Sequence, residues 1–202
     1  PVVPVEFSWN LAGLGNWNSA ANWTPAGGPA NSASHTAILG SSITADSTIT
    51  VDTPVTVNRI EFKNTTQTYA VSGLASVNLS ATTDPDNPVS PTLSVQGNHQ
   101  FQAVVNLGAD ATADIASDST LTFNNTLALM GHTLTKTGEG TMAIRNDLTL
   151  GGGTVELAQG SIAGNGTIGG NVNNAGGTIS PGNLAAVTLS EVPEPEAALL
   201  LV

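Results

Sequence analysis

The sequence predicts an all-β fold: a β-solenoid or β-helix-like stack of short strands with an aromatic cap at its N-terminal end. Three observations support this prediction. Apolar residues recur at alternate positions in short groups, turn-forming residues follow every six to twelve residues, and no segment before the tail shows helical periodicity. A single strand–turn–strand unit cannot bury its apolar face alone, so neighbouring units must cover it and the stack has two ends.

The repeat is clearest between Thr133 and Asn183. Residues two apart lie on the same face of a strand, and glycine, asparagine or proline turns separate the groups, which are Met142/Ile144, Leu148/Leu150, Val155/Leu157, Ile162, Ile168, Val172 and Ile179. We therefore expect the interior of this region to be filled by Leu134, Leu148, Leu150, Val155 and Leu157.

The same alternation continues upstream. It predicts strands from Ile43 to Phe62, with a turn at 52–54, from Tyr69 to Leu79 and from Leu93 to Leu129. Residues 81–91 contain three prolines and are predicted to form a loop. The predicted organisation is an extended N-terminal arm at 1–6, a solenoid-like domain at 7–190 with a subdivision near 84–91 left open, and a C-terminal tail at 191–202.

The three tryptophans of the chain, Trp9, Trp17 and Trp23, lie within fifteen residues of one another. The structural interpretation is an aromatic plug that closes the open end of the stack. The alternative is a glycan contact, because exposed indole faces stack on sugar rings.

Charge excludes some partners. The formal net charge is −11, only 9% of the 202 residues are charged, and there is no cysteine. Four basic residues, dispersed along the chain, cannot neutralise a run of phosphates, so a nucleic-acid partner is not expected. Disulfides and thiolate chemistry are excluded. No membrane span is expected in the given chain, since the apolar run at 197–202 is far shorter than the roughly 20 residues that a helix needs.

The sequence offers little catalytic chemistry. His35, His99 and His132 stand in Ser-, Thr- and Gln-rich surroundings typical of structural histidines, and no nucleophile-elbow motif accompanies them. We expect no enzyme activity and no cofactor. Asp84 and Asp86 are candidate Ca²⁺ ligands, and the alternative interpretation of these residues is an Asx-type turn.

Two segments resemble known families. TLTKTGEGTMAI, LTLGGGTVELAQGSIAGNGTIGG and GGTISPGN resemble the glycine-rich β-solenoid repeats of autotransporter passenger domains and related bacterial surface proteins. Val192, Pro193, Glu194 and Pro195 resemble the VPEP sorting motif of PEP-CTERM proteins. The second resemblance implies an exported bacterial protein that is processed near this motif and delivered to the cell surface or the extracellular matrix.

These observations favour an exported structural protein, a subunit of an extracellular filament or matrix assembled through β-strand contacts with copies of itself. Val2, Val3, Val5 and Phe7 would form an extended arm that adds to the next subunit as a strand, or that folds back on its own subunit. The alternative function is a monomeric surface adhesin or carbohydrate-binding module, with an extracellular polysaccharide as its partner.

Overall fold

The computed structural model describes residues 4–84, 86–146 and 152–181. Within these ranges the chain consists of strands, turns and loops, with one short 3-10 turn at Ala20–Asn22 and no α-helix. The predicted all-β class is therefore confirmed. No helix in the described ranges is long and apolar enough to cross a membrane.

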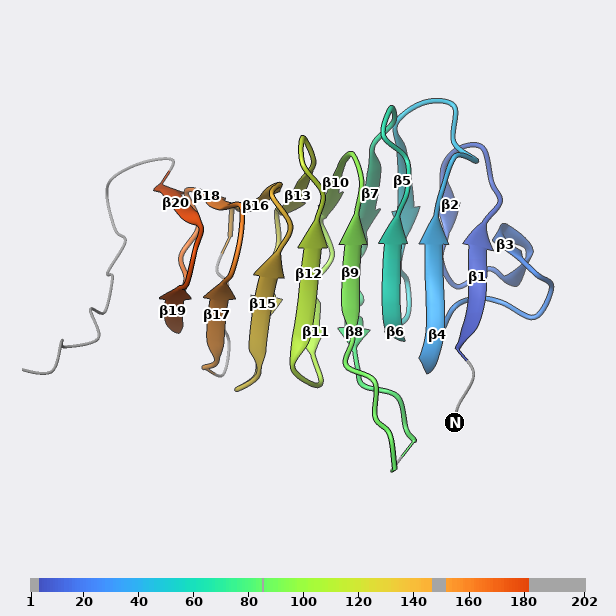
Figure 1. Cartoon of the computed structure of the whole chain (residues 1–202). Helices are drawn as coiled ribbons and strands as arrows, with labels where there is room; N and C mark the ends of the chain where they lie inside the picture. The colour runs from blue at the N-terminus through green and yellow to red at the C-terminus, as the bar shows by residue number, and fades with distance from the viewer. Residues whose placement is uncertain (1–3, 85, 147–151, 182–202) are drawn as a thin grey trace, which may run out of the picture.

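The strands form two long sheets (Figure 1). Sheet A has twelve strands, which are β1 (Val5–Trp9), β3 (Trp23–Thr24), β4 (Ser32–Leu39), β6 (Val55–Phe62), β8 (Val77–Leu79), β9 (Thr92–Val95), β11 (Val105–Leu107), β12 (Ala111–Ile115), β14 (Leu127–Ala128), β15 (Thr133–Thr137), β17 (Thr154–Leu157) and β19 (Asn171–Asn174). Sheet B has eight, which are β2 (Gly15–Asn16), β5 (Ser47–Thr50), β7 (Tyr69–Ser72), β10 (Asn98–Phe101), β13 (Thr120–Phe123), β16 (Thr141–Ile144), β18 (Ser161–Gly164) and β20 (Thr178–Pro181).

The chain winds as a coil that adds a strand to each sheet in turn, as in a β-solenoid (Figure 1). Neighbouring coils pair in parallel, and β1 with β3 is the one antiparallel pair among the described strands. Successive partners in sheet B are separated by 22, 30, 22, 21, 20 and 17 residues, in the series Ile49, Val71, Phe101, Phe123, Ile144, Gly164 and Pro181. The second interval contains the loop at 81–91, and the coils shorten steadily after it.

Sheet A divides at β6, whose two halves have different partners. Val55–Val57 pairs with β8, whereas Arg59–Phe62 pairs with β9. The short strands β8, β11 and β14 continue from the first half and give the middle coils a third wall. Within the described residues, no further strand of this third wall follows β14.

The core runs through the stack as rows of in-register side chains. One row along sheet A is Ala37, Ile60, Leu93, Ala113, Lys136 and Leu157. Leu134, Val155 and Leu157 are fully buried, as the repeat pattern predicts. Leu148 and Leu150 lie outside the described residues. At the C-terminal end the core thins, because Ile168 and Ile179 are only partly buried.

Most predicted turns are confirmed, and six of the predicted strand positions lie outside the strands. The turn at 52–54 and the loop at 81–91 are present, and this loop projects from the body of the stack below β8 (Figure 1). Both sheets pass the loop without a break. These positions, which alternation places in strands, are Ile43, Ala45, Val51, Ala103, Leu129 and Ile168. Each lies beside a turn, where the pleated geometry of a strand has ended.

Candidate functional site

The tryptophan cluster closes the N-terminal end of the stack. Trp9, Trp17 and Trp23 are at most 2% exposed, and their rings pack edge to face, with centroids 5.2 Å apart for Trp9–Trp23 and 4.9 Å for Trp17–Trp23. The antiparallel pairing of Trp9 with Trp23 holds two of them in register. Such pairs contribute packing energy beyond the area that they bury.

Hydrogen bonds from the ring N–H groups hold two of the three indoles in position. Trp17 Nε1 donates to the Ala30 carbonyl at 2.8 Å, and Trp23 Nε1 donates to the Trp17 carbonyl at 2.7 Å. The structure thus agrees with the interpretation as an aromatic plug. The alternative, a glycan contact at these residues, is not supported, because no indole face is open to a sugar.

The N-terminal arm belongs to the stack from Val5 onward. Val5 to Ser8 pairs in parallel with His35 to Ile38 of the same chain, and Phe7 is 5% exposed. Of the two alternatives for this segment, the structure agrees with the one in which it folds back on its own subunit, since strand pairing holds Val5 and Phe7 and Phe7 is also buried. Val2 and Val3 lie outside the described residues, as does the sorting motif Val192, Pro193, Glu194 and Pro195.

Asp84 organises the tip of the projecting loop. Its Oδ1 accepts hydrogen bonds from the backbone N–H groups of Asp86, at 3.1 Å, and Asn87, at 3.3 Å. This geometry is an Asx-type turn. Within the described ranges no group of three His, Asp or Glu side chains gathers around a common point, so Asp84 and Asp86 are not joined by a third carboxylate or imidazole ligand.

The three histidines occupy separate structural positions. His99 is buried: its ring stacks on Phe62 at 4.7 Å, Nδ1 accepts a bond from the Tyr69 N–H at 3.1 Å, and Nε2 lies 2.9 Å from the Gln96 carbonyl. Burial lowers the pKa of His99. His35 accepts a bond from the Asn31 N–H, and its pKa is also lowered by burial.

His132 lies at the surface, with its Nδ1 3.6 Å from Asp110 Oδ1. Among the hydrogen bonds of the described residues, none joins a serine hydroxyl to His35, His99 or His132.

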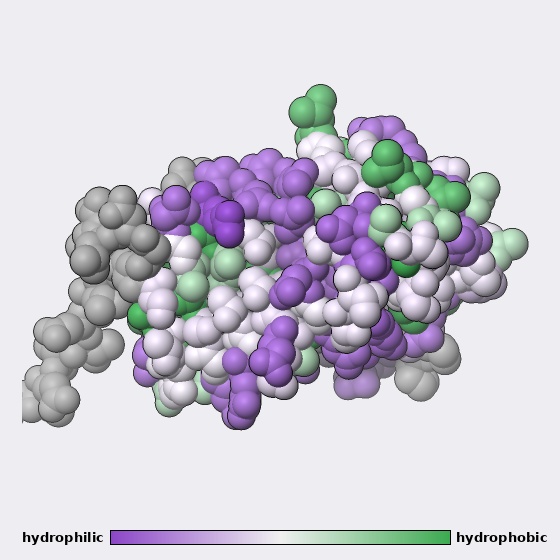
Figure 2. All heavy atoms as spheres, turned by 90° about the horizontal axis from the view of Figure 1, so that it is seen from above, coloured by the Kyte–Doolittle hydropathy of each residue, from purple (hydrophilic) through white to green (hydrophobic). Residues whose placement is uncertain are grey.

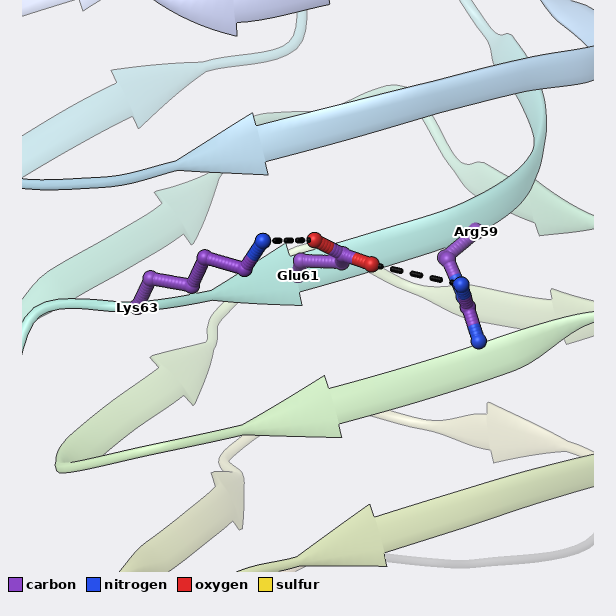
Figure 3. A network of polar contacts seen from close by, with 3 residues as sticks. All are labelled: Arg59, Glu61 and Lys63. Carbon is purple, nitrogen blue, oxygen red and sulfur yellow. Dashed lines mark ion pairs between the residues drawn. The ribbon is translucent and has the colours of Figure 1, made fainter. Parts of the chain in front are cut away.

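Two of the four basic residues are used in one surface network on β6 and just after it (Figure 3). Arg59 lies 3.3 Å and Lys63 2.5 Å from the two carboxylate oxygens of Glu61. Glu61 is only 12% exposed, whereas the two cations are nearly half exposed. The network neutralises a poorly solvated carboxylate on the outer face of sheet A.

Lys136 is a third structural cation, and the sequence gave no sign of its burial. Although it is charged, it is fully buried in the core row of sheet A. Its Nζ donates to the carbonyls of Thr137 at 2.6 Å, Gly138 at 2.7 Å and Gln159 at 3.3 Å. Burial lowers the pKa of Lys136, and the nearby Asp114 carboxylate opposes this effect. The lysine of the LTKTGEGT segment thus ties its own turn to the next coil.

The outer face of sheet B is the most regular polar surface of the stack. In register along it lie two rows, Asn98–Thr120–Thr141–Ser161–Thr178 and Gln100–Thr122–Ala143–Ala163–Ser180. None of the eight strands of sheet B contains Asp, Glu, Lys or Arg. By contrast, the strands of sheet A carry Glu6, Arg59, Glu61, Asp114, Lys136 and Glu156.

A shallow, open hollow lies on this face. It is lined by Thr68, Asn98, His99, Gln100, Thr120 and Thr122. The Asn124 carboxamide donates to Gln100 Oε1 at 2.6 Å, and the hydroxyls of Thr141 and Ser161 are 3.0 Å apart. The first bond holds Gln100, which lines the hollow, and the second joins two hydroxyls of the neighbouring strands β16 and β18. Sequence reasoning missed this surface, although the absence of charge in NHQF, TLTF, TMAI and SIAG is a visible signal.

The hydropathy of the surface differs along the molecule. Viewed from above, much of the surface is pale, the colour of residues of intermediate hydropathy such as Thr, Ser and Gly, and apolar side chains project from the half far from the C-terminal end (Figure 2). The large exposed apolar residues are Val5, Leu14, Leu74, Val89 and Met130.

The last described coil leaves strand edges unpaired. Among the described residues, nothing pairs with the outer edge of β19 or of β20. The side chains of β19 are mostly exposed, and no Lys or Arg follows Arg145 in the sequence. The N-terminal end differs, because β3 covers part of the outer edge of β1, at Ser8 and Trp9.

These sites must be judged on their own geometry. A comparison of the chain with protein-family models, curated proteins and solved structures found no match.

Proposed function

We propose that this protein is an exported structural protein that associates end to end through its β-strand edges, as a subunit of an extracellular filament or matrix. The observation that carries the proposal is the difference between the two ends of the stack. A tryptophan plug fills one end and β3 covers β1 there only at Ser8 and Trp9, whereas within the described residues β19 and β20 at the other end have no partner on their outer edges. Open edges of parallel strands are templates for another strand.

The end strands of sheet A have compatible directions. β1 runs parallel to β4, and β19 runs parallel to β17. If β19 of one copy lies beside β1 of the next, sheet A continues across the contact with every strand still parallel. One type of edge then meets a different one, and such head-to-tail contacts generate open filaments.

The assembly strand is therefore not the free arm expected from the sequence. In this proposal the donor and acceptor are the β19 edge and the outer edge of β1 at Val5–Phe7, which β3 leaves uncovered. Export rests on the resemblance of 192–195 to a sorting motif, and a surface or matrix location follows from it.

Backbone polarity gives a specific test. The N–H groups of Asn171 and Ala175 point toward the preceding coil, where they donate to the carbonyls of Gly153 and Leu157. Because alternate residues of a parallel strand bond to opposite neighbours, the Val172 N–H points to the open edge. Val172→Pro removes this donor and keeps an apolar side chain.

We expect Val172→Pro to shift the protein from concentration-dependent oligomers to monomers in sedimentation velocity. Val172→Ala, which shortens the side chain but keeps the N–H, is the matched control and should still assemble. Equal assembly of the proline and alanine variants would disprove the role of the β19 edge.

A further inference from the structure

The outer face of sheet B combines regular spacing, neutrality and a fixed polar hollow. We propose that this face binds a neutral polysaccharide laid along the stack, with the hollow around Gln100 and Thr120 as the strongest subsite. The inference does not depend on end-to-end assembly, because the face lies along the side of the stack and not at its ends.

Hydrogen-bonding chemistry supports a polyhydroxylated ligand. Threonine and serine hydroxyls donate and accept, and asparagine and glutamine carboxamides present both functions side by side, as sugar hydroxyls require. Within the described residues no acceptor is bonded to Gln100 Nε2, while Asn124 holds its Oε1. The carboxamide is therefore oriented before the ligand arrives, which lowers the entropy cost of binding.

Charge indicates a neutral ligand. The strands of sheet B contribute no ionic side chain, and the turns beside the hollow carry the exposed acids Asp118 and Glu139. In a chain with a formal net charge of −11, an acidic polysaccharide would be repelled and would find no cation in the strands of this sheet, since Arg145 lies just beyond the end of β16.

Repetition compensates for weak single contacts. All the aromatic rings of the described sheet B strands, those of Tyr69, Phe101 and Phe123, are buried, so no ring stacks on a sugar there. The polar rows recur with the strand spacing of about 4.8 Å. A polymer that spans several coils engages several such contacts at once, and its apparent affinity rises through effective concentration.

The test uses the purified chain and five named polymers. Retention is measured on amorphous cellulose, curdlan and dextran as neutral polymers, and on polygalacturonate and alginate as acidic ones. We expect retention on at least one neutral polymer, no retention on either acidic one, and little change between low and high salt, since screening affects only charged contacts.

Lysine substitutions locate the surface. Thr120→Lys with Thr122→Lys should abolish retention, because long charged side chains fill the hollow. The matched control is Thr92→Lys with Thr112→Lys, in-register residues on the outer face of sheet A, and it should bind as the unaltered chain does. Far-UV circular dichroism checks that both variants remain folded.

A milder pair keeps the proposal testable if the lysine variant does not fold. Asn98→Ala with Gln100→Ala removes two carboxamides from the rim, and we expect about tenfold weaker retention. Val172→Pro should bind the polymer normally, so loss of assembly and loss of binding are separable.

Several results would overturn the proposal. These are no retention on any neutral polymer, unchanged retention of folded variants of the sheet B face, and stronger retention on an acidic polymer. A change in the sedimentation of the protein alone caused by the lysine pair would instead identify this face as a contact between copies.

Discussion

At the scale of single residues, His99 shows how the stack uses a titratable group for structure. The neutral ring accepts the Tyr69 N–H and stacks on Phe62. Burial lowers the pKa of His99 below the ordinary value of 6.5. The unfolded chain therefore binds a proton more tightly than the folded one does, and protonation favours unfolding.

This shift predicts a pH-dependent stability. The contribution of His99 is fully present above about pH 6.5 and is lost as the pH falls from that value towards the lowered pKa of the folded state. His99→Asn, whose Oδ1 can still accept the Tyr69 N–H, should lose less stability over this range in denaturant titrations. An identical pH dependence for His99→Asn and the unaltered chain would contradict this account.

At the scale of elements, the turns depend on glycines that lie against the neighbouring coil. Gly73, which directly follows β7, has a φ of +136°, and a Cβ there would lie 2.2 Å from the Val51 carbonyl oxygen. A residue with a Cβ would be strained at this φ and would clash with the backbone of the neighbouring coil.

We therefore expect Gly73→Ala to destabilise the protein by about 2–4 kcal/mol, because strain and a backbone clash act together. Gly13→Ala is the control: nothing lies within 4 Å of a Cβ at Gly13, so its effect should be below about 0.5 kcal/mol. Urea unfolding of both variants measures the difference. A Gly73→Ala variant as stable as Gly13→Ala would show that the turn adapts.

Strands and turns were the elements that the sequence could predict. Apolar alternation located Met142–Ile144 and Val155–Leu157, and proline identified the loop at 81–91. Alternation reports which face of a strand is buried, but it carries no information on partners. The fork of sheet A at β6 and the pairing of β1 with β4 were therefore not predictable.

The candidate surface on sheet B was not predictable either, again because alternation carries no information on strand partners. Thr122 and Gln100 are ordinary outward residues in their own strands, and only the register of sheet B places them beside one another. Nothing in the sequence indicated that Lys136 is buried, because charged residues are usually solvated, yet the carbonyls of a tight turn satisfy its ammonium inside the stack. Burial of the tryptophans, in contrast, was predictable from their clustering next to an open end.

At the scale of the whole molecule, stability should fall from the N-terminal to the C-terminal end. Each coil of a solenoid contacts only its neighbours, so local stability follows local burial. The first coils bury the tryptophan plug, whereas β19 is largely exposed and Ile179 is only partly buried.

Amide hydrogen exchange of the monomeric Val172→Pro variant tests this gradient without interference from assembly. We expect the amides of β17 to β20 to exchange first and those of β4, β6 and β9 last. Uniform protection throughout the stack would contradict a thinning core.

Electron microscopy with fibre diffraction of the purified protein, at increasing concentration, tests the central claim of end-to-end assembly most directly. The account predicts unbranched filaments whose strands lie across the axis, with a meridional reflection near 4.8 Å that continues the spacing within each subunit. Particles that stay single at every concentration, or filaments without that reflection along their axis, would contradict it.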